Sequence, residues 1–204
     1  CILSALAFGN HVYPKNVHCE GITKIALEDV AYAASIGASI KLIGTAEDRG
    51  NGKLYIVVSP AIVMAESQLN SVSDVFNAVL VNGDATDEVL FFGKGAGKLP
   101  TASAVVADAL DCMEHDNNRR PIFWGPEKPE LIMDYQEIPN KYYIRLKGAD
   151  KDAICAAFAD ATFLEGATDD IAFISNEITE NEARAKISTI SNAELCSLIR
   201  VARC

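Results

Sequence analysis

The chain has 204 residues, half of them hydrophobic, which is enough for one large domain or two small ones and argues against wholesale disorder. Its 28 acidic and 18 basic side chains give a formal net charge of −10, which disfavours binding to a nucleic-acid backbone. Because no apolar run is long enough to cross a bilayer and no secretory signal is visible, we expect a cytoplasmic protein that binds neither membrane nor nucleic acid.

The first half of the chain alternates between segments typical of helices and of strands. Asp29 is expected to cap a short helix that runs to Ile36 and ends at Gly37. Apolar and β-branched residues predict four strands, at 39–46, 53–63, 75–82 and 88–93. The last two are close enough in sequence to form an antiparallel hairpin. Helices against such a sheet predict a mixed α+β fold, with the helices on one face.

Two proline positions refine these predictions. Pro60 is expected to place the end of its strand at an edge or a bend, and Pro100 precedes a helix predicted over 101–113, with Thr101 as its cap or a first-turn residue. The four strands carry apolar residues on both of their faces over much of their length. One face would therefore need a partner, and we expect a homodimer.

The remainder of the chain changes character twice. Residues 116–140 contain four prolines and are expected to form a linker. Beyond it, the pattern predicts a strand–helix–strand–strand–helix–strand order at 142–148, 152–161, 170–175, 182–189, 192–198 and 199–202. That order is the ferredoxin-like βαββαβ arrangement. The expected domains are thus 1–115 and 141–204, joined by 116–140.

The segment with most chemical content is Gly93–Thr101, which reads GKGAGKLPT between a predicted strand and a predicted helix. Glycines let backbone N–H groups approach a ligand closely, and a helix N-terminus favours an anion. The spacing matches neither a P-loop nor a Rossmann fingerprint. An anion-binding loop, favoured slightly by Lys94 and Lys98, and a tight turn without a ligand both remain open.

Other candidates point to no catalytic group. Asp108 and Asp111 share a helix face without a partner base, Ser103 lies inside a helix, and Lys41 is more typical of a solvent-facing strand residue. The trio His11, His18 and Cys19 lacks a second ligand pair, so we expect no metal site. The six cysteines are scattered without a CxxC pair and are expected to be free thiols.

Taken together, several tracts resemble the C-terminal half of homoserine dehydrogenase. They are LAFG at 6–9, EGITKI at 20–25, Asp29 with Ala33, IKLIG at 40–44 and FFGKGAGKLPTASAVVADAL at 91–110. The resemblance covers about residues 2–113, and its most specific part is GKGAGKLPTASAVVAD. The segment that follows resembles the ACT regulatory domain that many bacterial members carry.

The resemblance implies an oxidoreductase that interconverts L-homoserine and L-aspartate 4-semialdehyde with NAD or NADP, on the route to threonine and methionine. It implies a catalytic and dimerisation domain whose sheet pairs two subunits. Gly95, Ala96 and Gly97 would approach the nicotinamide end of the cofactor, and Thr101 would begin a helix that returns to a Rossmann domain. The family's catalytic lysine would fall just before Cys1, so we expect a fragment that is inactive alone and holds no catalytic residue itself.

In the ACT-like segment, the resemblance implies an amino-acid effector, expected to be threonine, at the turn that holds Asp150, Lys151 and Asp152. Ala153 stands near the position where the family expects a glycine, and the two acidic side chains would repel a carboxylate. Two alternatives therefore stay open. The segment either senses an amino acid or only extends a dimer interface.

Overall fold

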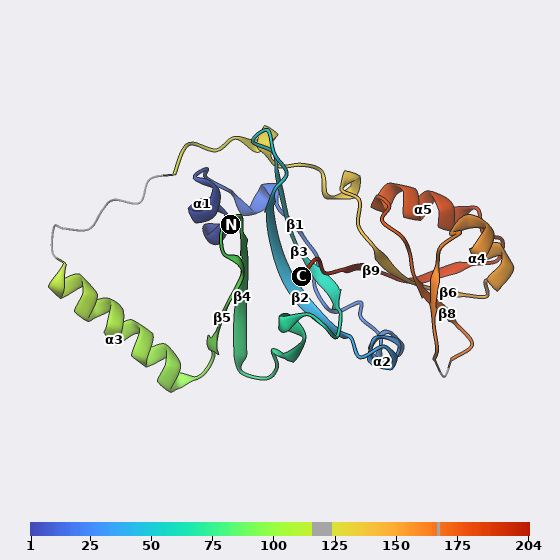
Figure 1. Ribbon diagram of the computed structural model, residues 1–204, viewed down its shortest axis with the longest axis horizontal. Coiled ribbons are helices and arrows are strands. Elements are labelled where there is room, and N and C mark those ends of the chain that lie inside the picture. Colours follow the sequence, from blue (N-terminus) through green and yellow to red (C-terminus); the bar gives the residue numbers. More distant parts are fainter. Residues whose placement is uncertain (116–123, 167) are drawn as a thin grey trace. The chain divides into compact units, whose positions relative to one another are not determined.

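The computed structural model describes residues 1–115, 124–166 and 168–204, and Figure 1 labels most of its helices and strands. The chain divides into two compact units. One comprises Cys1–Ala65 with Trp124–Arg203, and the other comprises Glu66–Phe123 with Cys204. These bounds differ from the divisions at 115 and 140 that we expected, because the start and the end of the chain build one unit together. We describe each unit by itself.

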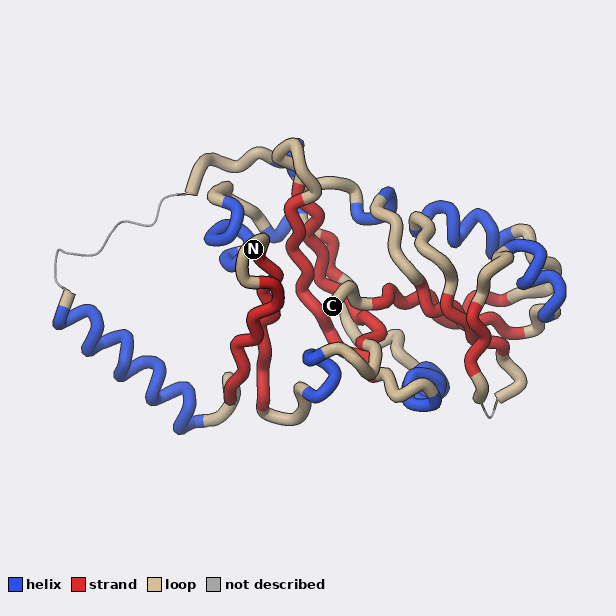
Figure 2. Tube along the Cα trace, viewed as in Figure 1, coloured by secondary structure: helices blue, strands red, loops and turns tan. Residues whose placement is uncertain are grey.

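A mixed sheet forms the centre of the first unit. Its seven strands within the described residues are β1 (His18–Cys19), β2 (Ser39–Asp48), β3 (Leu54–Val63), β6 (Tyr142–Lys147), β7 (Thr162–Leu164), β8 (Ile171–Ile174) and β9 (Glu194–Val201). The strand order is β1-β3-β9-β6-β8-β7, and β2 pairs with β3. These seven strands, red in Figure 2 like the other strands of the chain, thus combine both ends of the chain into one sheet.

Strand β3 joins the two ends of the chain. It pairs with β2 in antiparallel fashion along its whole length, from Leu54 to Val63. On its other side, it pairs in parallel with β1 at Val57 and Val58 and with β9 at Ala61 and Ile62. We had expected Pro60 to mark the end of its strand, but β3 continues through it to Val63. Pro60 lies between these two short ladders, at a point where neither needs a backbone N–H from it.

Helices cover the β6–β8–β9 part of the sheet on both faces. Tyr142, Ile144 and Leu146 point to one side, where they pack in a buried cluster with residues of α4 (Lys151–Ala157) and α5 (Glu180–Ser188). Tyr143 points to the other side, where it packs against α2 (Leu27–Ser35). This is the alternation that a strand imposes on successive side chains. A further helix, α1 (Ile2–Phe8), precedes the short turn η1 (Pro14–Asn16).

The C-terminal part has a βαββαβ order, as β6-α4-β7-β8-α5-β9, but the sequence did not predict β7, and two other segments were assigned wrongly. Residues 182–189, predicted as a strand, instead form most of helix α5 and its C-cap Thr189. The Thr179 side chain accepts from the Glu182 N–H, the Glu182 carboxylate accepts from the Thr179 N–H, and Ala183 and Ile187 bury one face. Residues 192–198, predicted as a helix, lie largely in β9.

The described part of the expected linker packs against the first unit. Residues 124–140 include the 3₁₀ turns η3 (Pro129–Leu131) and η4 (Tyr135–Glu137). The Met133 N–H donates to the Leu54 carbonyl at 2.8 Å, and Ile138 is buried beside Tyr55 and Val57. These residues therefore contribute to the core. The rest of the expected linker, residues 116–123, lies outside the described residues.

The second unit contains the turn η2 (Gln68–Ser71), the strands β4 (Phe76–Gly83) and β5 (Asp87–Lys94), and helix α3 (Lys98–Glu114). The two strands form the predicted antiparallel hairpin in register from Phe76↔Lys94 to Gly83↔Asp87. Helix α3 begins three residues before the predicted start. Thr101 is therefore its fourth residue, and its N–H donates to the Gly97 carbonyl.

Candidate functional site

The glycine segment joins β5 to α3, as the sequence predicted. Gly97 has φ +112°, which side chains rarely tolerate, and a Cβ on Gly95 would come within 2.4 Å of the Asn77 side-chain nitrogen. Gly97 therefore requires glycine, whereas a side chain at Gly95 would displace the exposed Asn77 side chain. Residues 93–98 are exposed, so their backbone is open to a ligand. The requirement for glycine is structural as well, and the roles of Gly95, Ala96, Gly97 and Thr101 toward a cofactor stay predictions.

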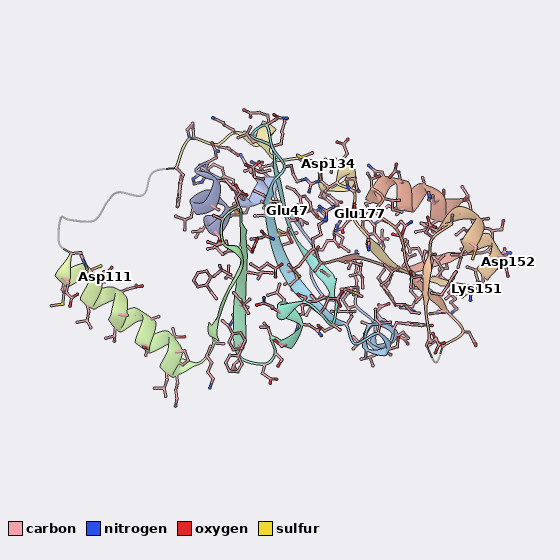
Figure 3. All side chains as sticks on the ribbon, in the orientation of Figure 1. Glu47, Asp111, Asp134, Lys151, Asp152 and Glu177 are labelled. Atoms are coloured by element: carbon pink, nitrogen blue, oxygen red, sulfur yellow. The ribbon has the colours of Figure 1, made fainter. Side chains whose placement is uncertain are left out.

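Helix α3 offers an uncovered apolar face within the second unit. None of its residues is buried, although a stripe at helical spacing consists of Leu99, Val106, Leu110 and Met113. Leu99 is 75% exposed and Met113 is 77% exposed. The Asp111 carboxylate, labelled in Figure 3, lies 2.9 Å from His115 Nδ1 on the helix surface, so its contact is with His115 and not with Asp108.

The turn that contains the predicted effector residues lies between β6 and α4. The Asp150 side chain caps the helix by accepting from the Asp152 and Ala153 N–H groups, at 3.1 and 3.3 Å. The amides that an effector carboxylate would use thus already have an acceptor. Lys151 extends over the ring of Phe163 at 4.5 Å, and Lys151 and Asp152 are exposed at the start of α4 (Figure 3).

Sequence reasoning missed a buried charge cluster centred on Asp29. Its carboxylate is fully buried and accepts from Arg145 Nε at 2.7 Å, Tyr143 Oη at 3.0 Å, Ser197 Oγ at 2.7 Å and the Ala26 N–H at 3.0 Å. Burial opposes its ionisation, but these hydrogen bonds outweigh burial and hold the Asp29 pKa below its ordinary value. Asp29 is thus the third residue of α2 and not its cap.

The geometry around this cluster comes from β6 and β9. Arg145 Nη1 also donates to Asp170 at 2.5 Å, so its guanidinium bridges two carboxylates. The register between β6 and β9 shifts after Arg145, which pairs with Ser197 while Leu146 pairs with Leu195. Such a bulge re-aims side chains, and here the Ser197 hydroxyl donates to Asp29.

A second cluster surrounds Arg200 of β9. Its Nη1 donates to Glu20 at 2.9 Å, its Nη2 donates to Glu180 of α5, and its guanidinium lies over the Tyr135 ring at 5.0 Å. His18 Nε2 lies 2.7 Å from the same Glu20 oxygen. Burial opposes ionisation of Glu20, but the hydrogen bonds from Arg200 and His18 outweigh it and keep the Glu20 pKa below its ordinary value.

The remaining candidates add no site. Within the described residues, no group of His, Cys, Asp and Glu side chains is arranged to hold a metal ion, and His18 is engaged with Glu20. All six cysteines are free thiols. A search of the described helices finds none with the length and apolarity needed to span a membrane.

Comparison with known proteins decides the family. Residues 1–110 match the family model described as homoserine dehydrogenase. The chain belongs to the homoserine dehydrogenase family. It is 34% identical over 200 residues to the homoserine dehydrogenase of Neisseria gonorrhoeae, a match that covers 95% of this chain and 46% of the relative. With the homoserine dehydrogenase of Synechocystis it shares 29% identity over 98% of this chain and 52% of that protein.

Solved structures show a similar fold. The homoserine dehydrogenase of Thiobacillus denitrificans superposes with a TM-score of 0.80 at 29% identity, over 98% of this chain and 51% of that one. That of S. aureus at pH 6.0 gives 0.75 at 26% identity, over 100% and 52%. The chain therefore spans about half the length of the relatives it matches, and the family match ends before the βαββαβ segment begins.

Proposed function

We propose that this chain supplies the C-terminal half of a homoserine dehydrogenase, which interconverts L-homoserine and L-aspartate 4-semialdehyde with NAD or NADP in threonine and methionine biosynthesis. The observation that carries the proposal is the family match over residues 1–110, which includes the glycine segment between β5 and α3. Because the chain spans about half of its relatives, the nucleotide-binding half and the proton-transfer lysine would come from residues outside it.

The glycine segment fits a role beside such a cofactor. Gly97 has a φ that side chains rarely tolerate, the backbone of 93–98 is exposed, and Lys94 and Lys98 supply positive charge near a dianionic ligand. The cofactor would provide the hydride. In this proposal, the apolar stripe of α3 packs on the nucleotide-binding half, which accounts for a 17-residue helix without one buried residue.

A chimeric enzyme tests the dehydrogenase proposal. The first half of the N. gonorrhoeae relative would be fused to this chain at Cys1, and oxidation of NADH and NADPH would be followed with aspartate 4-semialdehyde. We expect turnover by the chimera and none by the 204-residue chain alone. A folded chimera without turnover would refute the proposal.

A matched pair of substitutions in the chimera locates the cofactor contact. Gly97→Val introduces a side chain at φ +112° and should lower activity at least tenfold, whereas Asp84→Ala, in the exposed turn of the hairpin in the same unit, should leave activity unchanged. Far-UV circular dichroism of both variants checks that α3 persists. Equal activity of the two variants would remove the glycine segment from the site.

We also propose that the protein is a homodimer. In the β4–β5 hairpin, four large apolar residues are each between 43% and 62% exposed: Val79, Val81, Phe91 and Phe92. A second copy of the chain would cover such an apolar surface. Light scattering coupled to size exclusion tests this directly. A monomer at micromolar concentration in the active chimera would count against it.

A second candidate function is amino-acid sensing by the βαββαβ segment, favoured by its strand order β9-β6-β8-β7, which is that of a ferredoxin-like module. Since Asp150 occupies the amides at the start of α4, an effector would have to engage Lys151 and Asp152 by their side chains. Thermal shifts with threonine, methionine, lysine and homoserine test this. A ligand at 100 times its Kd should add about 2.7 kcal/mol of stability, and no shift with any of them leaves a structural module.

A further inference from the structure

Segment 21–25 lies between two anchors, Glu20 and Ala26, and at each of them residues of the C-terminal βαββαβ module hold a carboxylate. Residues Gly21–Lys24 are exposed, and a Cβ on Gly21 would meet no atom within 4 Å. A single turn bond, from the Ile25 N–H to the Ile22 carbonyl, is the internal backbone hydrogen bond that the structure gives this segment. Its conformation is therefore set at its two ends.

The first anchor is Glu20. Its N–H donates to the Val58 carbonyl at 2.7 Å, and its carboxylate, 37% exposed, accepts from Arg200 Nη1 at 2.9 Å. Arg200 is itself buried and is held by Glu180 of α5 and by the ring of Tyr135. The Glu20 backbone is thus held by β3, whereas its carboxylate is held by His18 and by Arg200, whose position depends on the packing of β9 against α5.

The second anchor is the Ala26 N–H, which donates to Asp29 at 3.0 Å. Asp29 is fixed in turn by Arg145 and Tyr143 of β6 and by Ser197 of β9. The start of α2, and with it the end of the 21–25 segment, therefore follows the register of β6 and β9. Ile25 adds an apolar contact to the cluster that contains Tyr143 and Ile199.

We infer that the C-terminal module acts as a clamp on segment 21–25, with Arg200 and Arg145 as positioning residues for its two ends. Each anchor places one carboxylate of the family-matched region against an arginine of the module. A change in the packing of α5 or in the β6–β9 register would move an arginine and release one end of the segment. The clamp gives the module a physical route to the matched region, and it does not rest on the proposed enzymatic activity.

Limited trypsin digestion measures how often segment 21–25 opens, because Lys24 is an exposed cleavage site within it. Glu20→Gln removes the charge that Arg200 holds while leaving the Arg200–Glu180 pair intact, so we expect this variant to fold. When opening and closing are fast, the cleavage rate follows the population of the open form. Loss of a charge-assisted hydrogen bond should therefore speed cleavage after Lys24 about tenfold or more.

Two controls separate the clamp from general loosening. Cleavage after Lys53 and Lys98 in the same digest should keep its wild-type rate. Arg184→Gln removes a partner of Glu180 that does not touch Glu20, and it should not change cleavage after Lys24. Arg200→Gln and the double variant E20Q/R200Q complete a double-mutant cycle on the rate of cleavage after Lys24. Adding E20Q to R200Q should accelerate this cleavage little further, because the Glu20–Arg200 contact is already lost.

Hydrogen exchange gives a second measurement for variants that resist digestion. Amide protection of residues 20–26 should fall in E20Q and R200Q, while protection of β2 and β3 stays at the wild-type level. Unchanged cleavage after Lys24 in folded E20Q and R200Q would overturn the inference. Equal acceleration in R184Q, or fully additive effects in the double variant, would also overturn it.

Discussion

Replacing Asp29 with Asn removes one charge from the centre of the first unit without changing the shape of the side chain. In the native cluster, the carboxylate accepts from four donors. One of them, Arg145 Nε at 2.7 Å, is charged, and the other three are neutral. An Asn side chain offers one carbonyl oxygen, and its NH₂ group would face donors. Arg145, which is also buried, would keep Asp170 as its one carboxylate partner in the cluster.

The expected cost follows from this loss. Breaking a buried ion pair by removing one partner costs about 3–5 kcal/mol, and the remaining Arg145–Asp170 bond places Asp29→Asn at the lower end. With an m-value of about 1–3 kcal/mol/M, a loss of about 3 kcal/mol lowers the urea midpoint by roughly 1–3 M. Fluorescence of Trp124, the chain's sole tryptophan, reports the transition of the first unit.

A neighbouring residue provides the matched control. Glu28→Gln changes the adjacent, exposed carboxylate in the first turn of α2 and should alter stability by no more than about 0.5 kcal/mol. If Asp29→Asn cost less than about 1 kcal/mol, or no more than Glu28→Gln, the buried cluster would not be the stabilising element that its geometry indicates.

Three further changes follow from the same structure. Because the Asp29 pKa is lower in the folded protein than its ordinary value of 3.8, its ionisation stabilises the fold above about pH 4, and this stabilisation is lost as the pH falls further. The difference in urea midpoint between wild type and Asp29→Asn should therefore narrow below about pH 4. Gly148→Ala forces a side chain at φ +71° to within 2.8 Å of the Asn192 carbonyl oxygen and should cost about 2 kcal/mol in thermal unfolding, whereas Gly21→Ala should be nearly neutral. Thr179→Ala removes the cap of α5 and should cost about 1 kcal/mol; no change in the unfolding midpoint would contradict the role of the cap.

Local patterns predicted the elements whose stability is decided locally. Strands β2, β3, β4 and β5 lie where β-branched residues predicted them, and the glycine segment lies between a strand and a helix. Residues 182–189 were wrongly predicted as a strand. The sequence does carry helix signals there, because Thr179 and Glu182 form a capping box and the apolar Ala183 and Ile187 are four residues apart. A description by periodicity alone overlooked the cap.

The charge clusters could not be predicted in this way. Asp29 and Arg145 are 116 residues apart, and their contact depends on the pairing of β3 with β9 and on the bulge after Arg145. A lone aspartate before a helix is more often a cap, which is why Asp29 was assigned that role. Its actual hydrogen bond to the Ala26 N–H still serves the helix start, from the third helical position.

The family match ends at residue 110, but the first compact unit also includes Trp124–Arg203. Without residues 142–201, β3 would lose its partner at Ala61 and Ile62, and Asp29 would lose the arginine, tyrosine and serine that hold its charge. The truncation would also expose Tyr32 and Ala33 of α2, which pack on Tyr143, Ile199 and Val201, and exposing this apolar surface would be destabilising. The βαββαβ segment therefore belongs to the same folding unit as the first 65 residues of the matched region, and any regulation it exerts must pass through contacts that also stabilise the fold.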